Sequence, residues 1–390
     1  MHVTAALSRL GTETAFDVLA RAGTLAAAGH DVINLGIGQP DFPTPPHIVE
    51  AGIAALREGH HGYTPANGIP ALREAVVADI ARHRGVAVAP ERIVIQPGGK
   101  PTMFFAILMF GEPGAQILYP DPGFPIYRSM IEFTGATPVP VALPEARGFS
   151  FDPDAVLAQI TPATRLLILN SPGNPTGGVA PRAAVERLVA GLAAHPQVAI
   201  LSDEIYSRMH YDGAEPVSLL QYPEISDRLI LLDGWSKTYA MTGWRMGYGL
   251  WPEALVERAT RLCVNAHSCV NAATQQAGIA ALNGPQDAVA EMMAAFTARR
   301  DFLVPALNDV PGVRCAMPGG AFYAFPNVEG TGIPASVLQD RLLQEAHVAT
   351  IAGPSFGVLA PNNLRLSFAN SLENIERAVE RLAGWLRHNT

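Results

Sequence analysis

Lysine is almost missing from this chain of 390 residues. Of its 27 basic residues only two are lysine, Lys100 and Lys237, and the other 25 are arginine. A genome that favours arginine explains most of this bias. Arginine nevertheless stays protonated at any working pH, whereas lysine can become a neutral amine nucleophile. The two remaining lysines are therefore candidates for a chemical role.

Other absences exclude whole classes of protein. The three cysteines form no Cys-x-x-Cys pair and the eleven histidines show no metal-binding spacing, so neither a disulfide framework nor a zinc site is predicted. The longest apolar stretch, around 103–110, is too short to span a bilayer, and the N-terminus lacks a signal-peptide pattern. The net charge of −8 argues against nucleic acid or a membrane as partner. We expect a cytoplasmic protein with small-molecule partners and no metal.

Short apolar runs alternate with helical patterns through the first two thirds of the chain. Strands are predicted over 92–96, 116–119, 165–169, 198–202, 229–232 and 246–250, and helices over 102–110, 125–133, 154–160 and 181–193. The runs 166–169 and 198–201 are continuously apolar, as in strands that are covered on both faces. The pattern indicates an α/β domain with a mostly parallel sheet.

The pattern changes after about residue 251. Helical periodicity covers 252–281 and 286–307, followed by short strands at 321–325, 348–351 and 364–368 and a closing helix over 371–387. The first forty or so residues look like an arm with a strand at 32–35. We predict an arm and part of a small domain over 1–45, a large domain over 46–284, and a smaller α+β domain over 285–390.

Polar or glycine-rich segments follow four of the predicted strands, at the sheet edge where ligands of open α/β proteins bind. They are Pro-Gly-Gly-Lys at 97–100, Asn-Ser-Pro-Gly-Asn-Pro-Thr-Gly at 170–177, Ser-Asp-Glu-Ile-Tyr at 202–206 and Asp-Gly-Trp-Ser-Lys-Thr at 233–238. Two glycines at a helix start leave backbone N–H groups open to an anion. Ser236 and Arg245 could add a hydroxyl and a guanidinium to the same anion.

These segments resemble the motifs of one family. Residues 236–245, Ser-Lys-Thr-Tyr-Ala-Met-Thr-Gly-Trp-Arg, are similar to the lysine segment of class I/II aminotransferases, the pyridoxal-phosphate enzymes of fold type I in the aspartate aminotransferase superfamily. The segments at 36–42, 63–68, 170–177, 202–206 and 364–367 also resemble family motifs, in the family's order along the chain. The resemblance implies a large domain with a mostly parallel seven-stranded sheet and a smaller α+β domain.

The resemblance also implies roles toward pyridoxal 5′-phosphate. Lys237 would bond covalently to the cofactor aldehyde and then move the substrate proton, because a primary amine is required. Asp203 would pair with the protonated pyridine nitrogen. The other cofactor-binding residues implied are Tyr206 and Asn174 at the ring oxygen, Phe124 stacked on the ring, and Gly99, Lys100, Ser236 and Arg245 at the phosphate. Tyr127, Tyr239 and Trp244 are assigned to packing.

Further roles concern the substrate and a second subunit. Arg365 would clamp the substrate α-carboxylate, since a planar carboxylate matches the guanidinium fork, with Gly38, Asn174 and Phe124 nearby. Tyr63 would reach the phosphate of the neighbouring subunit. The resemblance therefore implies a homodimer with shared active sites.

The substrate stays open between two classes of L-amino acid. The Lys100 side chain hints at an acidic donor such as aspartate, whereas Glu13, the phenylalanine at 124 and the absence of arginine from 264–271 favour a neutral or aromatic donor. We predict a ping-pong aminotransferase with a 2-oxo acid acceptor such as 2-oxoglutarate. The alternatives are a β-eliminating C–S lyase and the effector-sensing domain of a transcription regulator. The net charge and the roughly forty residues before Gly36 argue against the second alternative.

Overall fold

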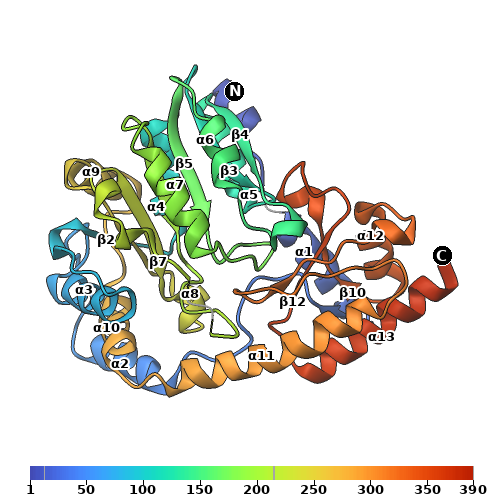
Figure 1. Ribbon diagram of the computed structural model, residues 1–390. Helices are drawn as coiled ribbons and strands as arrows, with labels where there is room; N and C mark the ends of the chain where they lie inside the picture. The colour runs from blue at the N-terminus through green and yellow to red at the C-terminus, as the bar shows by residue number, and fades with distance from the viewer. Residues whose placement is uncertain (13, 214–215, 390) are drawn as a thin grey trace.

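A seven-stranded sheet forms the centre of the large domain in the computed structural model, which describes residues 1–12, 14–213 and 216–389 (Figure 1). Its strands are β2 (Ile93–Gln96), β3 (Gln116–Asp121), β4 (Thr137–Ala142), β5 (Thr164–Asn170), β6 (Ala199–Asp203), β7 (Leu229–Gly234) and β8 (Gly247–Leu250). Their order is β2-β8-β7-β6-β5-β3-β4, and only β8 pairs antiparallel with its neighbours. The predicted mostly parallel α/β sheet is confirmed.

The central strands are buried on both faces, as their apolar runs predict. Along β5, Leu167 joins the core cluster on one face, while Leu166 and Ile168 join the cluster on the other. Along β6, Ile200 and Leu201 divide between the faces in the same way. Alternate side chains of a strand point to opposite faces, so a strand between two helical layers needs apolar residues throughout.

The edge strand β4 was not predicted from the sequence. Its sequence, Thr-Pro-Val-Pro-Val-Ala, contains Pro138 and Pro140, and proline is read as a strand breaker. The N–H of Thr137 points into the sheet and donates to the Ala115 carbonyl, just before β3. Because N–H groups alternate in direction along a strand, Pro138 and Pro140 occupy positions whose N–H groups would point away from the sheet. An edge strand needs donors on one side only, which is why two alternate prolines are tolerated here.

The helices of the large domain cover the sheet. The predicted helices are α4 (Lys100–Phe110), α5 (Pro125–Thr134), α6 (Pro153–Ala158) and α7 (Arg182–Leu192), and α2 (Pro46–Arg57) and α3 (Pro70–Arg84) were not predicted. The helical pattern at 252–281 divides into α9 (Glu253–His267) and α10 (Ala272–Asn283). Ser268 ends α9 with φ +63°, and the Asn271 side chain accepts a hydrogen bond from the Thr274 N–H to start α10.

The smaller sheets lie together with the chain ends. Strand β1 (Ile33–Asn34) pairs parallel with β10 (Val348–Ala349), and β12 (Leu364–Ser367) lies between β11 (Ile351–Ala352) and β9 (Tyr323–Ala324). Helices α1 (Thr14–Ala27), α12 (Ala335–Glu345) and α13 (Leu372–Asn389) lie around them, and α11 (Asp287–Asn308) runs toward them from the large domain (Figure 1). The N-terminal strand is therefore held by the C-terminal part of the chain, while the exact domain limits stay a prediction.

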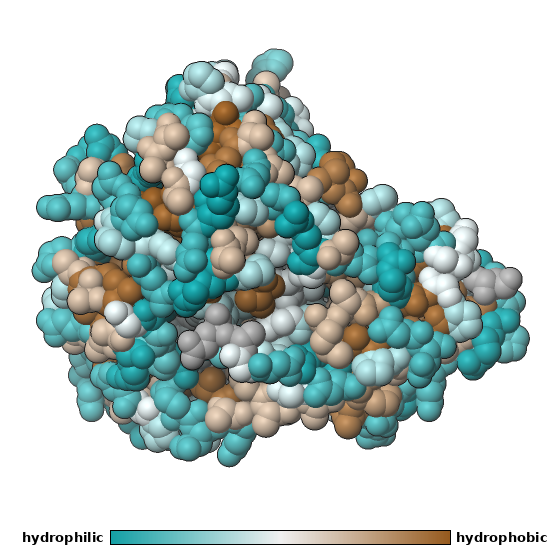
Figure 2. Space-filling model, viewed as in Figure 1, coloured by the Kyte–Doolittle hydropathy of each residue, from teal (hydrophilic) through white to brown (hydrophobic). Residues whose placement is uncertain are grey.

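The face seen in Figure 2 is mostly hydrophilic, with scattered apolar side chains. Within the described residues, every helix is too short or too polar to cross a membrane.

Candidate active site

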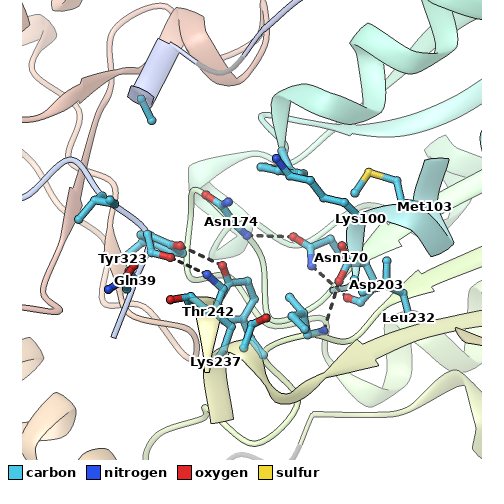
Figure 3. A pocket seen from close by; sticks show the side chains of 18 of the residues that line it. Gln39, Lys100, Met103, Asn170, Asn174, Asp203, Leu232, Lys237, Thr242 and Tyr323 are labelled. Carbon is cyan, nitrogen blue, oxygen red and sulfur yellow. Dashed lines mark hydrogen bonds between the residues drawn. The ribbon is translucent and has the colours of Figure 1, made fainter. Parts of the chain in front are cut away.

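The cavity of about 630 Å³ lies at the carboxyl edge of the seven-stranded sheet (Figure 3). Every site residue expected from the sequence except Tyr63 lines it: Gly38, Gly99, Lys100, Phe124, Asn174, Asp203, Tyr206, Ser236, Lys237, Arg245 and Arg365. The parallel strands explain this convergence, since their carboxyl ends meet at one edge. Strand β8 runs the other way, so Arg245, which stands just before it, also reaches this edge.

Lys237 lies in α8 (Trp235–Thr238), the short helix that follows β7. Its Nζ donates a hydrogen bond of 2.5 Å to the Gly38 carbonyl, which belongs to the segment that follows β1. The same amine lies 5.7 Å from the ring centre of Phe322 and 6.0 Å from that of Tyr206. The lysine is thus held between the large domain and the segments that come from the chain ends.

Asp203 ends β6 and is only 5% exposed. Its Oδ2 accepts a hydrogen bond of 2.6 Å from the Tyr127 hydroxyl, and its Oδ1 accepts one of 3.2 Å from the Ile205 N–H. Burial raises the pKa of Asp203 to about 6, although both hydrogen bonds act to lower it. Asn170 donates 3.0 Å to the Asp203 carbonyl and so fixes the backbone at this point. A buried carboxylate of this kind favours a cationic partner.

The start of α4 forms the second part of the cavity. Gly98 has φ +91°, and a Cβ at this position would lie 2.4 Å from Nη2 of Arg245. Arg245 itself is held by hydrogen bonds to the carbonyls of Thr242, at 2.7 Å, and Pro97, at 3.3 Å. The buried Ser236 stands one residue before Lys237. A helix N-terminus, open glycine amides, a hydroxyl and a guanidinium together suit a phosphate.

Arg365 on β12 forms the opposite wall and is 4% exposed. Its Nη1 donates 2.9 Å to Oδ1 of Asn174, and its Nη2 donates 2.5 Å to the Gly36 carbonyl. The guanidinium lies 4.7 Å from the ring centres of Tyr323 and Phe356, which keep its plane in place. Such a fixed, planar guanidinium suits a carboxylate.

Several residues at the site were not assigned to it from the sequence, among them Tyr127, Tyr323 and Phe16. Tyr127 was assigned to packing, yet its hydroxyl contacts Asp203, and burial raises its pKa well above the usual value. The hydroxyl of Tyr323 shares a hydrogen bond of 2.9 Å with that of Tyr206. Phe16 on α1 lines the cavity and lies 6.0 Å from Lys100 Nζ, which is 5.3 Å from the ring centre of Phe124. Only the Tyr127 spacing after Phe124 offered a signal in the sequence.

Two sequence expectations concern residues away from this cavity. Tyr63 is 93% exposed and does not line the cavity of its own chain. Glu13, which was weighed in the choice of substrate, lies outside the described residues. Among the residues that the structure describes, no group of three or more histidine, cysteine, aspartate or glutamate side chains could hold a metal ion.

Comparisons with known proteins agree with this geometry. A sequence model of the family described as aminotransferase class I and II matches residues 30–382. The chain is 39% identical over 368 residues to an aspartate aminotransferase of Geobacillus stearothermophilus, which covers 93% of each chain. It is 37% identical to an aspartate/prephenate aminotransferase of Cereibacter sphaeroides, with 96% of each chain covered.

A solved structure is similar over almost the whole chain. The aspartate aminotransferase of Rhizobium meliloti aligns with a TM-score of 0.94 and 33% identity, covering 99% of each chain. The resemblance read from the motifs is therefore confirmed by family, relatives and fold. The chain belongs to the aminotransferase class I and II family, has the pyridoxal-phosphate fold type I, and is a transaminase.

Proposed function

We propose that this enzyme binds pyridoxal 5′-phosphate in the cavity and transfers the amino group of an L-amino acid to a 2-oxo acid such as 2-oxoglutarate, in two half-reactions. One observation carries the proposal: the Lys237 amine, the buried Asp203 carboxylate and the Arg365 guanidinium all line one cavity. These groups match an aldehyde, a pyridinium and an α-carboxylate, in that order.

The residues present fit the cofactor. The cavity of about 630 Å³ is large enough for a phosphorylated pyridine together with a small amino acid. A Cβ at Gly98 would fill the space beside the Arg245 guanidinium, so the glycine keeps the phosphate end open. Asp203, with its pKa raised by burial, gains most from a cation placed against it.

On the cofactor side, each residue has a physical task. The bound cofactor supplies an aldehyde and a ring that accepts electrons from the substrate α-carbon. Asp203 would keep the proton on the pyridine nitrogen, and the hydrogen bond from Tyr127 keeps its carboxylate in place. Tyr206 and Asn174 would donate to the ring oxygen, and Phe124 would lie against the ring. Gly99, Lys100, Ser236 and Arg245 would hold the phosphate.

On the substrate side, Arg365 would bind the α-carboxylate with two of its guanidinium nitrogens, and Asn174 orients Arg365. In the cofactor-free enzyme the Gly38 carbonyl holds the Lys237 amine at the cavity wall. Once the substrate amino group has replaced Lys237 at the cofactor aldehyde, Lys237 Nζ would move the proton from the substrate α-carbon to the former aldehyde carbon. Water would then release the 2-oxo acid and leave the amino group on the cofactor, from which a second 2-oxo acid would take it by the reverse path.

The proposal includes a homodimer whose active sites are shared. The exposed Tyr63 would reach the phosphate bound by the neighbouring subunit. Large apolar side chains at Leu56 and Val264 are also exposed, at 52% and 56%, as expected of residues that a second subunit covers. A cytoplasmic location stays a prediction.

The scarcity of lysine makes the covalent link to the cofactor easy to test. Borohydride reduction of the protein with its cofactor should attach a pyridoxyl group to one peptide, which contains Lys237, and peptide mass spectrometry would locate it. The Lys237→Ala variant should carry no label, because arginine cannot form the bond and the remaining lysine, Lys100, is assigned to the phosphate end. A label on Lys100, or no label on the wild type, would refute the assignment.

The donor remains to be identified between aspartate and a neutral or aromatic amino acid. The Lys100 ammonium could receive a distal carboxylate, whereas Phe16 and Phe124 beside it offer apolar surface. A half-reaction screen decides between the two classes of donor. Each amino acid is mixed with the loaded enzyme, and the change in the visible cofactor band is followed. A response to aspartate but not phenylalanine supports the acidic donor, and the reverse response supports the aromatic one.

A further inference from the structure

A buried ion cluster lies next to the active-site residues but outside the cavity they line. It consists of Arg84, the last residue of α3, together with Glu204 and Asp233, and each of the three is at most 7% exposed. Arg84 Nε donates 2.9 Å to Oε2 of Glu204, and Arg84 Nη2 donates 2.5 Å to Oδ2 of Asp233. One guanidinium therefore joins two buried carboxylates.

Both carboxylates have a full set of donors. Oε1 of Glu204 accepts from the hydroxyls of Ser202 and Ser218, each at 3.0 Å, and from the Leu219 N–H at 3.2 Å. Asp233 accepts from the Ser207 hydroxyl at 3.1 Å and the Gly234 N–H at 2.7 Å. Burial raises the pKa of Asp233, whereas the Arg84 guanidinium and the Gly234 N–H act to lower it. With one guanidinium, which is always charged, and two carboxylates, the ion cluster has a formal net charge of −1.

The place of this cluster in the fold connects it to the reacting groups. Glu204 directly follows Asp203 at the end of β6, and Asp233 lies near the end of β7, four residues before Lys237. The two strands are paired neighbours, with Asp203 opposite Leu232. Arg84 therefore joins the two chain segments that carry the pyridinium partner and the reactive amine.

Several other titratable groups surround these carboxylates. Tyr127 and Tyr206 face Asp203, and burial raises the pKa of both, so they stay neutral. On the cluster's side stand Tyr248 of β8, whose pKa burial also raises, and Asp79 of α3, which is paired with His83. Arg208 lines a small second cavity beside Arg84 and donates to Tyr239 and Gln286 instead. Arg84 is thus the guanidinium that contacts both cluster carboxylates.

We propose that Arg84 is a positioning residue for cofactor binding, which acts by offsetting one of the two negative charges of Glu204 and Asp233 so that Asp203 stays ionised toward the pyridinium. This inference rests on the proposed function of the cavity. Without Arg84, two uncompensated negative charges would stand beside Asp203. Like charges nearby favour the protonated form of a carboxyl group, and a protonated Asp203 holds a pyridinium poorly.

The test measures binding of pyridoxal phosphate to the cofactor-free protein by equilibrium dialysis between pH 5 and 8. Arg84→Met should move the pH at which binding weakens upward by about one unit, so the dissociation constant should rise about tenfold at pH 5 but only about twofold at pH 7. The double variant Arg84→Met/Asp233→Asn restores the cluster charge of −1 and should return the pH profile toward that of the wild type. Arg82→Met, an exposed neighbour on α3, is the matched control and should leave the profile unchanged.

A second variant keeps the test decisive if Arg84→Met does not fold. Asp233→Asn alone leaves the Arg84–Glu204 pair and a neutral cluster, so the pH at which binding weakens should move downward. Weaker binding with an unmoved pH profile, or no restoration in the double variant, would mean that Arg84 only stabilises the fold and would overturn the inference. A wild-type protein that binds no pyridoxal phosphate would overturn the proposed function as well.

Discussion

Asp203 has an environment that suits a cationic partner. Its carboxyl group is 5% exposed, and burial raises its pKa to about 6, with Tyr127 and Ile205 as its hydrogen-bond donors. In the unfolded chain the pKa of an aspartate is about 3.9. A group whose pKa is raised by folding stabilises the protein below the unfolded pKa, and this contribution is lost as the pH rises through the folded value.

The upward shift of the Asp203 pKa predicts how the stability of the cofactor-free protein depends on pH. Asp203→Asn should be more stable than the wild type at pH 7 to 8, by up to about 3 kcal/mol, because the buried negative charge is removed. The difference in free energy of unfolding, measured with urea, should close as the pH falls through 6 toward 4. With pyridoxal phosphate bound, the order should reverse, since Asp203 then pairs with a cation. A stability difference that does not change with pH would contradict the assigned ionisation.

At the scale of elements, the loop before α4 is shaped by one glycine. Gly98 has φ +91°, a conformation that costs other residues energy, and an added Cβ would lie 2.4 Å from Nη2 of Arg245. Gly59 has a similar φ of +88°, but nothing lies within 4 Å of its Cβ position. The two glycines therefore separate backbone strain from the contact with Arg245.

We expect Gly98→Ala to weaken cofactor binding at least tenfold, because the guanidinium must move away from the phosphate position. Gly59→Ala should lower the free energy of unfolding by about 1 kcal/mol and leave cofactor affinity unchanged. Titration of each cofactor-free variant with pyridoxal phosphate, beside a urea unfolding curve, makes the comparison. Equal loss of affinity in both variants would show that the effect is strain alone.

The elements that the sequence predicts are those with a strong apolar pattern. Six of the seven strands of the large sheet, β4 excepted, were found within one or two residues, because their continuous apolar runs match burial on both faces. The edge strand β4 was missed because its prolines remove donors that only a central strand needs. The break between α9 and α10 depends on the backbone at Ser268, which helical periodicity does not report.

The site residues likewise divide into those that the sequence predicts and those that only the packing brings together. Residues in the loops after parallel strands could be brought together from the sequence, because the topology collects those loops at one edge. Tyr127, Tyr323 and Phe16 come from helices and strands whose packing decides where the side chains point, and Arg84 reaches Asp233 across 149 residues. No local pattern in the sequence specifies such contacts.

At the scale of the whole molecule, Tyr63 can show whether two chains share each active site or whether one chain builds it alone. It is 93% exposed and does not line the cavity of its own subunit. If each site takes Lys237 from one chain and Tyr63 from the other, two defective chains can rebuild one complete site.

We therefore expect complementation between Tyr63→Ala and Lys237→Ala. Each variant alone should be nearly inactive at limiting cofactor, whereas a mixture refolded together should recover about a quarter of wild-type activity, because half of the dimers are mixed and each has one intact site. The double variant Tyr63→Ala/Lys237→Ala, refolded with the Tyr63→Ala chain, can form no complete site and should stay inactive. No recovery in the mixture would place the phosphate contact elsewhere.

The prolines of β4 also affect how the molecule behaves among its neighbours. Thr137 and Leu143 direct their N–H groups toward β3, so Pro138 and Pro140 fall at the alternate positions, which face the outer edge of the sheet. At these two positions the edge lacks the donors that an incoming strand would require, and the Pro140 carbonyl already accepts a hydrogen bond from Gln159. Exposed strand edges are starting points for aggregation, and prolines at these positions prevent it. The two prolines therefore disfavour the extension of the large sheet from one molecule into the next through β4.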